Sequence, residues 1–390
     1  RYGGRREKRM SLRLAVLGLG RGAMLTVPAL AAHQGIEIVA GCDPQAAARA
    51  GFGGSCFESA EALLDWGRFD ALYVASPHEY HAAHAVMAAR AGKHVLVEKP
   101  MAVSLAEAAA MVRAAEAAGT VLMVGPSHGY DPPVELAASL IEGGEAGPLR
   151  LIHGFAFTDF LYRPRRPAEL DTAQGGGVVF SQATHQIDMA RRLAMSPVAS
   201  VRAWTGGWGG RGSEGAFTAL LTFASGAAAS LTYSGMARYD SDGLASWVGE
   251  LGGAKQPDAH ARTRAALGRG DEAGAKAART FAAGWPAQAA PVHHEHLGSL
   301  LALCERADLE LTPDGVIVHG DAGPRAMAAP LPPVSRANVA EAFVRAVEGT
   351  APPLMNGRWG LESLAVCHAI LASARLGRDI SPADLLADLT

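Results

Sequence analysis

A lysine that directly follows a short apolar run is the first residue whose position indicates chemistry. Lys99 lies between Glu98 and Pro100, just after the apolar residues 94–97. If that run is a buried strand of an open α/β sheet, the lysine lies at the carboxyl edge of the sheet, where such sheets bind ligands. Loss of solvent lowers the pKa of a lysine and makes its amine a general base near neutral pH. The alternative is a surface lysine at a strand end, since charged strand ends are common.

A histidine and an aspartate one helical turn apart are the second candidate. Residues 178–188 follow the glycines 175–177, and we expect them to form a helix. His185 and Asp188 stand at i and i+3, which puts both side chains on one helical face. A carboxylate next to an imidazole sets its tautomer and raises its basicity. The pair could equally be structural, and the glycines could either let a ligand approach the backbone or form a flexible loop.

Three arginines in a proline-containing loop are candidates for binding an anion. Arg163, Arg165 and Arg166 stand in Tyr-Arg-Pro-Arg-Arg-Pro. The prolines stiffen the loop and reduce the entropy lost on ordering it, and an arginine offers two parallel N–H donors to a carboxylate. We therefore expect an anion clamp for an acidic substrate. A solvated basic loop or a contact between subunits is the open alternative.

A glycine-rich turn indicates a dinucleotide site. Gly18-Leu19-Gly20-Arg21-Gly22-Ala23 fits the pattern G-x-G-x-x-A, with an apolar run before it and a predicted helix after it. Gly18 permits the tight turn, Gly20 lets the backbone approach a pyrophosphate, and Ala23 keeps the helix close to the strand. The helix N-terminus supplies free N–H groups for the phosphates. An ordinary strand-to-helix turn is the less specific alternative.

An aspartate after the second predicted strand indicates which dinucleotide binds. Asp43 comes about 20 residues after the glycine-rich turn, as in the dinucleotide-binding pattern. Its carboxylate would accept hydrogen bonds from the adenosine ribose and repel a 2′-phosphate, which favours NAD over NADP. A helix cap ahead of Pro44 is the alternative role of Asp43. Arg21 could instead stack on the adenine or reach a 2′-phosphate.

The elements that position these residues divide into two patterns. In the first third of the chain, predicted strands at 12–17, 37–42, 70–75, 94–97 and 121–124 alternate with predicted helices. This alternation predicts a doubly wound parallel α/β sheet. Beyond residue 150, longer segments at 149–159, 198–206, 216–223 and 227–233 alternate polar and apolar residues, with a hairpin turn at 223–226. They predict a mostly antiparallel sheet.

The same patterns predict the domain boundaries. We expect residues 1–9 to be an extension outside the fold, 10–130 to form the Rossmann domain, and 131–390 to form a domain for substrate binding and oligomerisation. Residues 250–292 show little periodicity and are predicted to be a mobile or partly helical insertion. Two amphipathic helices within 335–376 are predicted to close the chain.

Composition excludes several classes of protein. The formal net charge of −3 over 390 residues argues against nucleic-acid binding, and no apolar run is long enough for a membrane helix. The four cysteines are too scattered for a disulfide framework or a zinc site, so we expect no metal and a cytoplasmic location.

The combination of motifs resembles the Gfo/Idh/MocA family, named after glucose-fructose oxidoreductase, inositol dehydrogenase and a rhizopine catabolism protein. The matching parts are 18–23, 42–44, 77–81, 91–100 and 175–188. The resemblance implies a Rossmann domain joined to an α/β domain whose open-faced sheet mediates homodimers or homotetramers. It implies a cofactor site made of Gly18, Gly20, Arg21, Gly22, Ala23, Asp43, Pro77, His81, Glu98 and Lys99. With the arginine loop, the expected substrate site comprises His128, Arg163, Arg165, Arg166, Ser181 and His185, and the catalytic residues are Lys99, His185 and Asp188.

One departure from the family motif concerns the substrate. The family has an aspartate at the position of Ser181, and in the sugar and inositol enzymes that aspartate holds substrate hydroxyls. The segments 124–131, 160–171 and 175–186 are instead similar to the phthalate 4,5-cis-dihydrodiol dehydrogenase branch, which oxidises a carboxylated ring cis-diol to a catechol. We therefore expect hydride transfer from such a diol to NAD, with Lys99 or His185 taking the proton. A sugar, glycoside or inositol dehydrogenase and a non-catalytic NAD-binding sensor are the alternatives.

Overall fold

The computed structural model describes residues 11–207, 210–267, 271–286 and 290–389. The predicted extension at residues 1–9 therefore lies outside the described residues. No helix in the described part of the chain is both long and apolar enough to cross a membrane.

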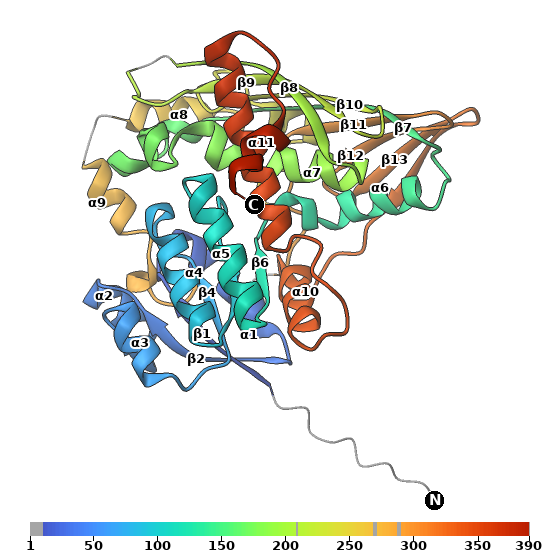
Figure 1. Ribbon diagram of the computed structural model, residues 1–390. Helices are drawn as coiled ribbons and strands as arrows, with labels where there is room; N and C mark the ends of the chain where they lie inside the picture. The colour runs from blue at the N-terminus through green and yellow to red at the C-terminus, as the bar shows by residue number, and fades with distance from the viewer. Residues whose placement is uncertain (1–10, 208–209, 268–270, 287–289, 390) are drawn as a thin grey trace, which may run out of the picture.

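The N-terminal part of the chain forms a parallel sheet covered by helices on both faces (Figure 1). Its strand order is β3-β2-β1-β4-β5-β6. The strands are β1 (Leu12–Leu17), β2 (Ile36–Cys42), β3 (Ser55–Phe57), β4 (Ala71–Val74), β5 (His94–Val97) and β6 (Leu122–Val124). The helices between them are α1 (Arg21–Ala32), α2 (Ala46–Phe52), α3 (Ala60–Trp66), α4 (His81–Arg90) and α5 (Leu105–Ala118). The predicted doubly wound fold is confirmed.

The burial of the central strands explains why they read as continuous apolar runs. Every residue of β4 is buried, as are the last four of β1. Strands covered on both faces have no solvent side that would select polar residues. The order of the strands reverses between β1 and β4, and at such a switch point the connecting loops separate and leave a crevice for a ligand.

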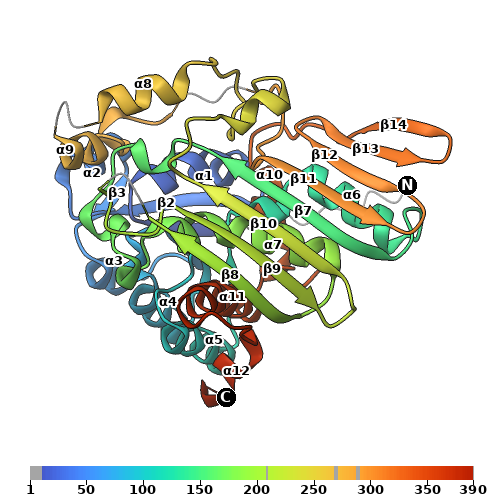
Figure 2. The same cartoon turned by 90° about the horizontal axis from the view of Figure 1, so that it is seen from above.

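The second sheet is mostly antiparallel and has one open face. Its order is β14-β13-β12-β11-β7-β10-β9-β8, in which only β10 and β7 pair in parallel. Helices α6 (Pro132–Glu142) and α7 (Thr184–Ala194) lie under the sheet in Figure 1, whereas Figure 2 looks onto the other face. The predicted strands correspond to β7 (Leu149–Phe157), β8 (Val198–Gly206), β9 (Ala216–Phe223) and β10 (Ala228–Ser234). The sequence analysis missed β11 (Ser299–Cys304), β12 (Asp308–Thr312), β13 (Gly315–Gly320) and β14 (Gly323–Ala328).

The two closing helices return to the N-terminal half of the molecule. Helix α10 (Ala337–Val347) packs beside α1, and α11 (Gly357–Leu376) lies between α5 and β8, followed by the short α12 (Pro382–Leu386). Phe343 of α10 is fully buried in a core cluster with Leu14 and Tyr73 of the parallel sheet. The predicted domain boundary near residue 130 stays a prediction. In the structure, α10 from the end of the chain packs against the helices and strands of the parallel sheet.

Residues 249–267 and 271–285, which we call the strap, run along one side of both sheets (Figure 2). The strap contains α8 (Ala259–Ala266), α9 (Glu272–Ala277) and a short turn at Phe281–Ala283. Phe281 is fully buried, and its ring packs against Phe52 at the end of α2 and against Trp285. Its backbone N–H donates to the carbonyl of Leu19 in the glycine-rich turn. The mobility predicted for residues 250–292 stays untested.

Candidate active site

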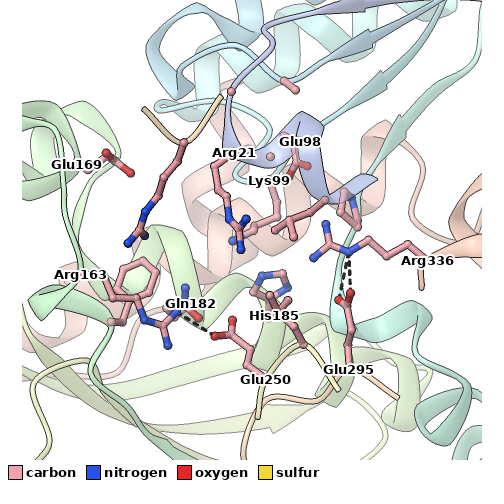
Figure 3. A pocket seen from close by; sticks show the side chains of 18 of the residues that line it. Arg21, Glu98, Lys99, Arg163, Glu169, Gln182, His185, Glu250, Glu295 and Arg336 are labelled. Carbon is pink, nitrogen blue, oxygen red and sulfur yellow. Dashed lines mark hydrogen bonds and ion pairs between the residues drawn. The ribbon is translucent and has the colours of Figure 1, made fainter. Parts of the chain in front are cut away.

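A cavity of about 780 Å³ lies where the parallel strands end and the second sheet begins. Its lining comes from the loops after β1, β4 and β5, from the start of α7 and from the strap. Gly18, Asp43, Lys99 and His185 all line this cavity, and Lys99 and His185 are near one another in Figure 3. Most of the predicted cofactor and substrate residues therefore share one pocket.

The glycine-rich turn has the geometry that a dinucleotide requires. Gly18 has φ +93°, and a Cβ there would lie 2.5 Å from backbone atoms of Ala75 and Ser76, so only glycine fits. A Cβ on Gly20 would meet nothing within 4 Å, which leaves open space at the start of α1. No side chain caps that helix, so its first N–H groups are available to a phosphate. The turn fits the pyrophosphate of a dinucleotide.

The rest of the turn supports this arrangement. Gly22 also lines the pocket, whereas Ala23 is fully buried in the first turn of α1. Asp43 is 8% exposed at the pocket wall. One of its oxygens accepts from the N–H of Leu19 at 2.9 Å and the other from the N–H of Gln45 at 2.8 Å. The carboxylate thus fixes the glycine-rich turn and the start of the next helix, and both oxygens keep a lone pair for a ribose hydroxyl.

Pro77 and His81 follow β4, and both are among the residues that line the pocket. Pro77 lines the pocket ahead of α4. His81 is fully buried, and its two ring nitrogens lie 2.9 Å from the carbonyl oxygen of Pro100 and 2.7 Å from that of Ser76. Both nitrogens face backbone carbonyls of the loops after β4 and β5. Burial lowers the pKa of His81, so the neutral ring donates to one of these carbonyls and presents neither nitrogen to a cofactor.

Lys99 is buried at the end of β5. Its Nζ donates to the carbonyl of Ser181 at 2.7 Å. Burial lowers the pKa of Lys99 to about 8, although the neighbouring carboxylates of Glu98 and Glu250 oppose the shift. Glu98 accepts a 2.5 Å hydrogen bond from the hydroxyl of Tyr73, and burial raises the pKa of this carboxyl group. The lysine can therefore lose its proton near neutral pH.

The segment predicted as one helix begins with a wider turn. Residues Val179–Ala183 form a π-helical turn that leads into α7. In this turn, the Ser181 carbonyl accepts the hydrogen bond from Lys99 Nζ. The Ser181 hydroxyl donates to the carbonyl of Gly177. Ser181, predicted to bind substrate through its side chain, is not among the pocket-lining residues. The structure thus assigns its backbone, and not its hydroxyl, to the site.

His185 faces the cavity as a hydrogen-bond donor. The backbone N–H of His128 donates to its Nδ1 at 3.3 Å. An acceptor at Nδ1 leaves the proton of the neutral ring on Nε2. Burial and the nearby Lys99 hold the pKa of His185 well below its ordinary value, so the ring is neutral. His185 can therefore orient a substrate oxygen by donating from Nε2.

The predicted pairing of Asp188 with His185 is wrong. The Asp188 oxygens accept from the hydroxyl of Ser127 at 2.7 Å, the hydroxyl of Ser363 at 2.6 Å and the indole N–H of Trp359 at 2.8 Å. Of these donors only Ser127 lines the cavity, and Asp188 itself does not. The i, i+3 spacing puts the two residues near one another, but the hydrogen bonds from Trp359 and Ser363 of α11 direct the Asp188 carboxylate away from His185. Asp188 holds the wall and does not set the imidazole tautomer.

His128 forms an ion pair beside His185. Its Nδ1 lies 2.6 Å from Asp131 Oδ2, and its ring meets that of His185 edge to face at 4.6 Å between centroids. Burial lowers the pKa of His128, but the Asp131 carboxylate outweighs burial and raises it overall. His128 lines the pocket, and its role in binding substrate stays a prediction.

The predicted anion clamp lines the pocket, but carboxylates already pair with its arginines. Arg163 contacts Asp159 at 2.8 Å and Glu250 at 3.3 Å. Arg166 contacts Glu79 at 3.2 Å and keeps a third of its side chain exposed. A substrate carboxylate would share these arginines with protein carboxylates.

Arg165 is the most firmly held of the three. Its guanidinium donates twice to the carbonyl of Phe160, at 2.8 and 3.2 Å, and stacks on the Phe160 ring at 3.5 Å. Glu169 lies 3.5 Å away on the other side. Burial lowers the pKa of Arg165 to about 10. These contacts give Arg165 a role in shaping the loop.

Several pocket residues were missed by the sequence analysis. Arg336, at the start of α10, enters the pocket with φ +67° and pairs with Glu295 at 3.1 Å. Arg279 comes from the strap, and within the described ranges neither it nor Arg21 has a carboxylate partner. Burial and the nearby Arg279 lower the pKa of Arg21. No local pattern marked Arg279 or Arg336, because folding alone brings their segments to the pocket.

Comparison with protein families matches both halves of the chain. Residues 12–126 match a model described as an oxidoreductase family with an NAD-binding Rossmann fold. Residues 134–255 match the GFO/IDH/MocA C-terminal domain. Together the two models cover most of the sheet and pocket residues described above.

Individual relatives agree with this result. The chain is 39% identical, over 93% of its length and 95% of the relative's, to 1-carboxy-3-chloro-3,4-dihydroxycyclohexa-1,5-diene dehydrogenase from Comamonas testosteroni. A solved dehydrogenase structure from Bordetella bronchiseptica RB50 superimposes with a TM-score of 0.89 at 38% identity, covering 95% of this chain and all of that one. An Agrobacterium radiobacter oxidoreductase, solved with NAD+, L-tartaric acid and magnesium, shares the fold with a TM-score of 0.73 at 20% identity, covering 97% of this chain and all of that one.

Proposed function

The chain belongs to the Gfo/Idh/MocA oxidoreductase family, and from this premise we propose that it oxidises a secondary alcohol of a carboxylated ring cis-diol, with NAD as the acceptor. The observation that carries the chemistry is the meeting of Lys99, His185 and the glycine-rich turn in one cavity. The observation that supports the substrate class is the full-length similarity to a carboxylated dihydroxycyclohexadiene dehydrogenase. Phthalate 4,5-cis-dihydrodiol is one candidate within this class.

Lys99 is the proposed general base. Because burial brings its pKa to about 8, a sizeable fraction of the amine is neutral near pH 8 and has a lone pair for the substrate's hydroxyl proton. The Ser181 carbonyl accepts one of its hydrogens and so fixes the direction of that lone pair. His185, with its proton on Nε2, donates to the same substrate oxygen and holds it in place. This division of roles chooses Lys99 over His185 as the base.

The residues around the glycine-rich turn are proposed to bind the cofactor. The first N–H groups of α1 face the pyrophosphate, and the Asp43 carboxylate accepts from the ribose hydroxyls. A 2′-phosphate would bring like charge close to Asp43, which favours NAD over NADP. When bound, NAD accepts the hydride that leaves the carbinol carbon.

The fate of the product makes a ring diol favourable. As the C–H bond breaks, the O–H proton moves to Nζ of Lys99, and a hydroxy-ketone forms. For a cyclohexadiene diol, this ketone tautomerises to an aromatic catechol, so the overall oxidation is strongly downhill. For a sugar or inositol the same residues would give a ketone in a reversible reaction.

A carboxylate on the substrate is supported by the charge of the cavity. Lysines and arginines outnumber aspartates and glutamates among the lining residues. Arg21 and Arg279 lack a carboxylate partner among the residues that the structure describes, and the cofactor pyrophosphate is a natural partner for one or both. The substrate carboxylate is then left to the arginine loop, where Arg166 is the least tightly held member.

A homodimer or homotetramer through the second sheet is also proposed. Leu151, Trp204 and Leu220 are 38%, 54% and 48% exposed. The strand register places all three on the open face, away from α6 and α7. An apolar patch on an open sheet face is typical of an interface. Sedimentation analysis of the enzyme and of Leu220→Glu tests this, because the charge would separate the subunits.

A location in the reducing cytoplasm is the remaining proposal. All four cysteines are free thiols in the structure. A protein that uses none of its cysteines in disulfides is typical of that compartment.

A substrate panel tests the proposed function. Purified enzyme with NAD is given a carboxylated ring cis-dihydrodiol, its methyl ester, an inositol and levoglucosan, and NADH formation is followed by absorbance. We expect kcat/KM to be highest for the carboxylated diol and lower for its neutral ester. Turnover of the inositol or levoglucosan, without turnover of the diol, would assign the enzyme to the sugar and polyol dehydrogenases. If none of the four compounds led to NADH formation, the proposed substrate class would lose its support.

A further inference from the structure

Gln182 is a buried polar side chain that the mechanism above does not use. It lines the cavity, is only 3% exposed, and its Oε1 has no hydrogen-bond partner among the residues that the structure describes. In Figure 3 it lies near His185 and the Arg163–Glu250 pair. A buried acceptor without a donor is destabilising, so native proteins keep few of them. Because Gln182 also lines the cavity, a ligand bound there can supply the missing donor.

The local backbone directs Gln182 toward the reacting position. It belongs to the π-helical turn Val179–Ala183, and such turns are frequent at functional sites. Its predecessor Ser181 holds Lys99 through a carbonyl, and His185 follows three residues later on the neighbouring surface of the helix. The amide, the proposed base and the orienting imidazole thus converge on one part of the cavity.

The protein donors nearby are already engaged. Arg163 donates to Asp159 and Glu250, and Lys99 donates to Ser181. A hydroxyl group matches the amide, because it can donate to Oε1 and accept from the amide nitrogen. The hydroxyl that is oxidised has Lys99 and His185 as partners. The adjacent hydroxyl of a vicinal diol has no partner assigned in the proposed mechanism.

We propose that Gln182 is a specificity-determining residue that binds the hydroxyl adjacent to the one oxidised, so that the enzyme selects vicinal ring diols over single alcohols. This inference rests on the proposed function. A site built to hydrogen-bond a hydroxyl discriminates strongly against an analogue without it, because its buried polar group is then unpaired.

The test compares two substrates on each enzyme preparation. One is a carboxylated ring cis-diol, and the other is the same ring acid without the second hydroxyl. We expect the parent enzyme to prefer the diol, and Gln182→Met to lower kcat/KM for the diol by roughly 10- to 100-fold while changing that for the single alcohol by less than about threefold. Gln182→Leu should act in the same way. Because the readout is a ratio, it does not depend on the folded fraction of a variant.

Gln186→Met is the matched control. Gln186 lies one helical turn further along α7, is equally buried with an unpaired Oε1, and does not line the cavity. Its substitution should leave the ratio between the two substrates unchanged. Equal losses on both substrates in Gln182→Met, or no loss on the diol, would overturn the inference while the proposed function stands. Failure of the parent enzyme to oxidise either ring acid would instead count against the proposed function itself.

Discussion

The amine of Lys99 should determine how the reaction depends on pH. Its pKa of about 8 means that the amine is protonated at lower pH and cannot accept the hydroxyl proton. We expect kcat/KM to fall about tenfold for each pH unit below about 8 and to level off above it. His185 is neutral throughout this range because its pKa is held well below its ordinary value. A profile that stays flat between about pH 6 and 9 would contradict the assignment of Lys99 as base.

Removing the amine should affect turnover far more than cofactor binding. Lys99→Ala is expected to lower kcat by roughly 10² to 10⁴, which is the usual contribution of a general base. The affinity for NADH, measured by fluorescence titration, should change little, since the glycine-rich turn and Asp43 are untouched. A variant with near-parent turnover would make His185 the leading candidate for the base.

Arg166 should distinguish acidic from neutral substrates. It is the member of the arginine loop with the most exposed side chain, at 34%, and its ion pairs with Glu79 and Glu169 are 3.2 and 3.6 Å long. Arg166→Ala should raise KM for a carboxylated diol by about 10-fold or more, near the lower end for a hydrogen bond to a charged group because the site is partly solvated. KM for the methyl ester should remain close to that of the parent enzyme. Equal effects on both substrates would show that Arg166 serves only to shape the loop.

The strap packs against α2 so closely at Gly51 that an added methyl group would not fit. Gly51 lies within α2, and a Cβ there would lie 1.8 Å from the carbonyl oxygen of Phe281. Alanine is otherwise the better helix former by about 0.5–1 kcal/mol, so any harm must come from displacing the strap. Because Phe281 also holds Leu19, we expect Gly51→Ala to raise KM for NAD by roughly tenfold and to expose the strap to limited proteolysis.

Gly320→Ala provides the control for that experiment. Gly320 ends β13, and a Cβ there meets nothing within 4 Å. This variant should keep the KM for NAD and the digestion pattern of the parent. If Gly51→Ala behaved in the same way, the strap would have no part in ordering the cofactor turn.

Helix α10 should stabilise the parallel sheet from the far end of the chain. Phe343 is fully buried among residues of β1 and β4. Phe343→Ala is expected to lower the free energy of unfolding by about 3–5 kcal/mol, the usual cost of such a cavity. Leu331→Ala, at a side chain that is 45% exposed, should change it by no more than about 0.5 kcal/mol. Urea denaturation followed by circular dichroism measures both, and similar values for the two variants would contradict this packing.

Local sequence patterns predicted the elements whose chemistry is local. The glycine-rich turn, Asp43 after β2 and Lys99 after β5 each depend on a strand and the few residues that follow it. Spacing failed for Asp188, because contacts with α11 and with Ser127 decide where its carboxylate points. The π turn and the position of Gln182 were not predicted, because helical periodicity in the sequence does not distinguish a π turn from an α turn.

For the whole molecule, distant contacts account for what the sequence did not predict. The strands β11 to β14 join the second sheet because β11 pairs with β7. These two strands are far apart in the sequence, so no local pattern encodes their pairing. Arg336 reaches the pocket because α10 docks beside α1, and Arg279 reaches it because the strap docks on α2. Such contacts depend on tertiary packing, which overrides local propensity.

The most direct measurement follows one hydrogen atom from substrate to cofactor. The enzyme is incubated with NAD and a carboxylated ring cis-dihydrodiol that carries deuterium on its carbinol carbons, and the reduced cofactor and the aromatic product are analysed by mass spectrometry. The account predicts one deuterium in each reduced cofactor and one catechol for each cofactor reduced, because the carbinol carbon is the hydride donor. Cofactor reduced without deuterium, or no reduction with this diol while an inositol is oxidised, would contradict it.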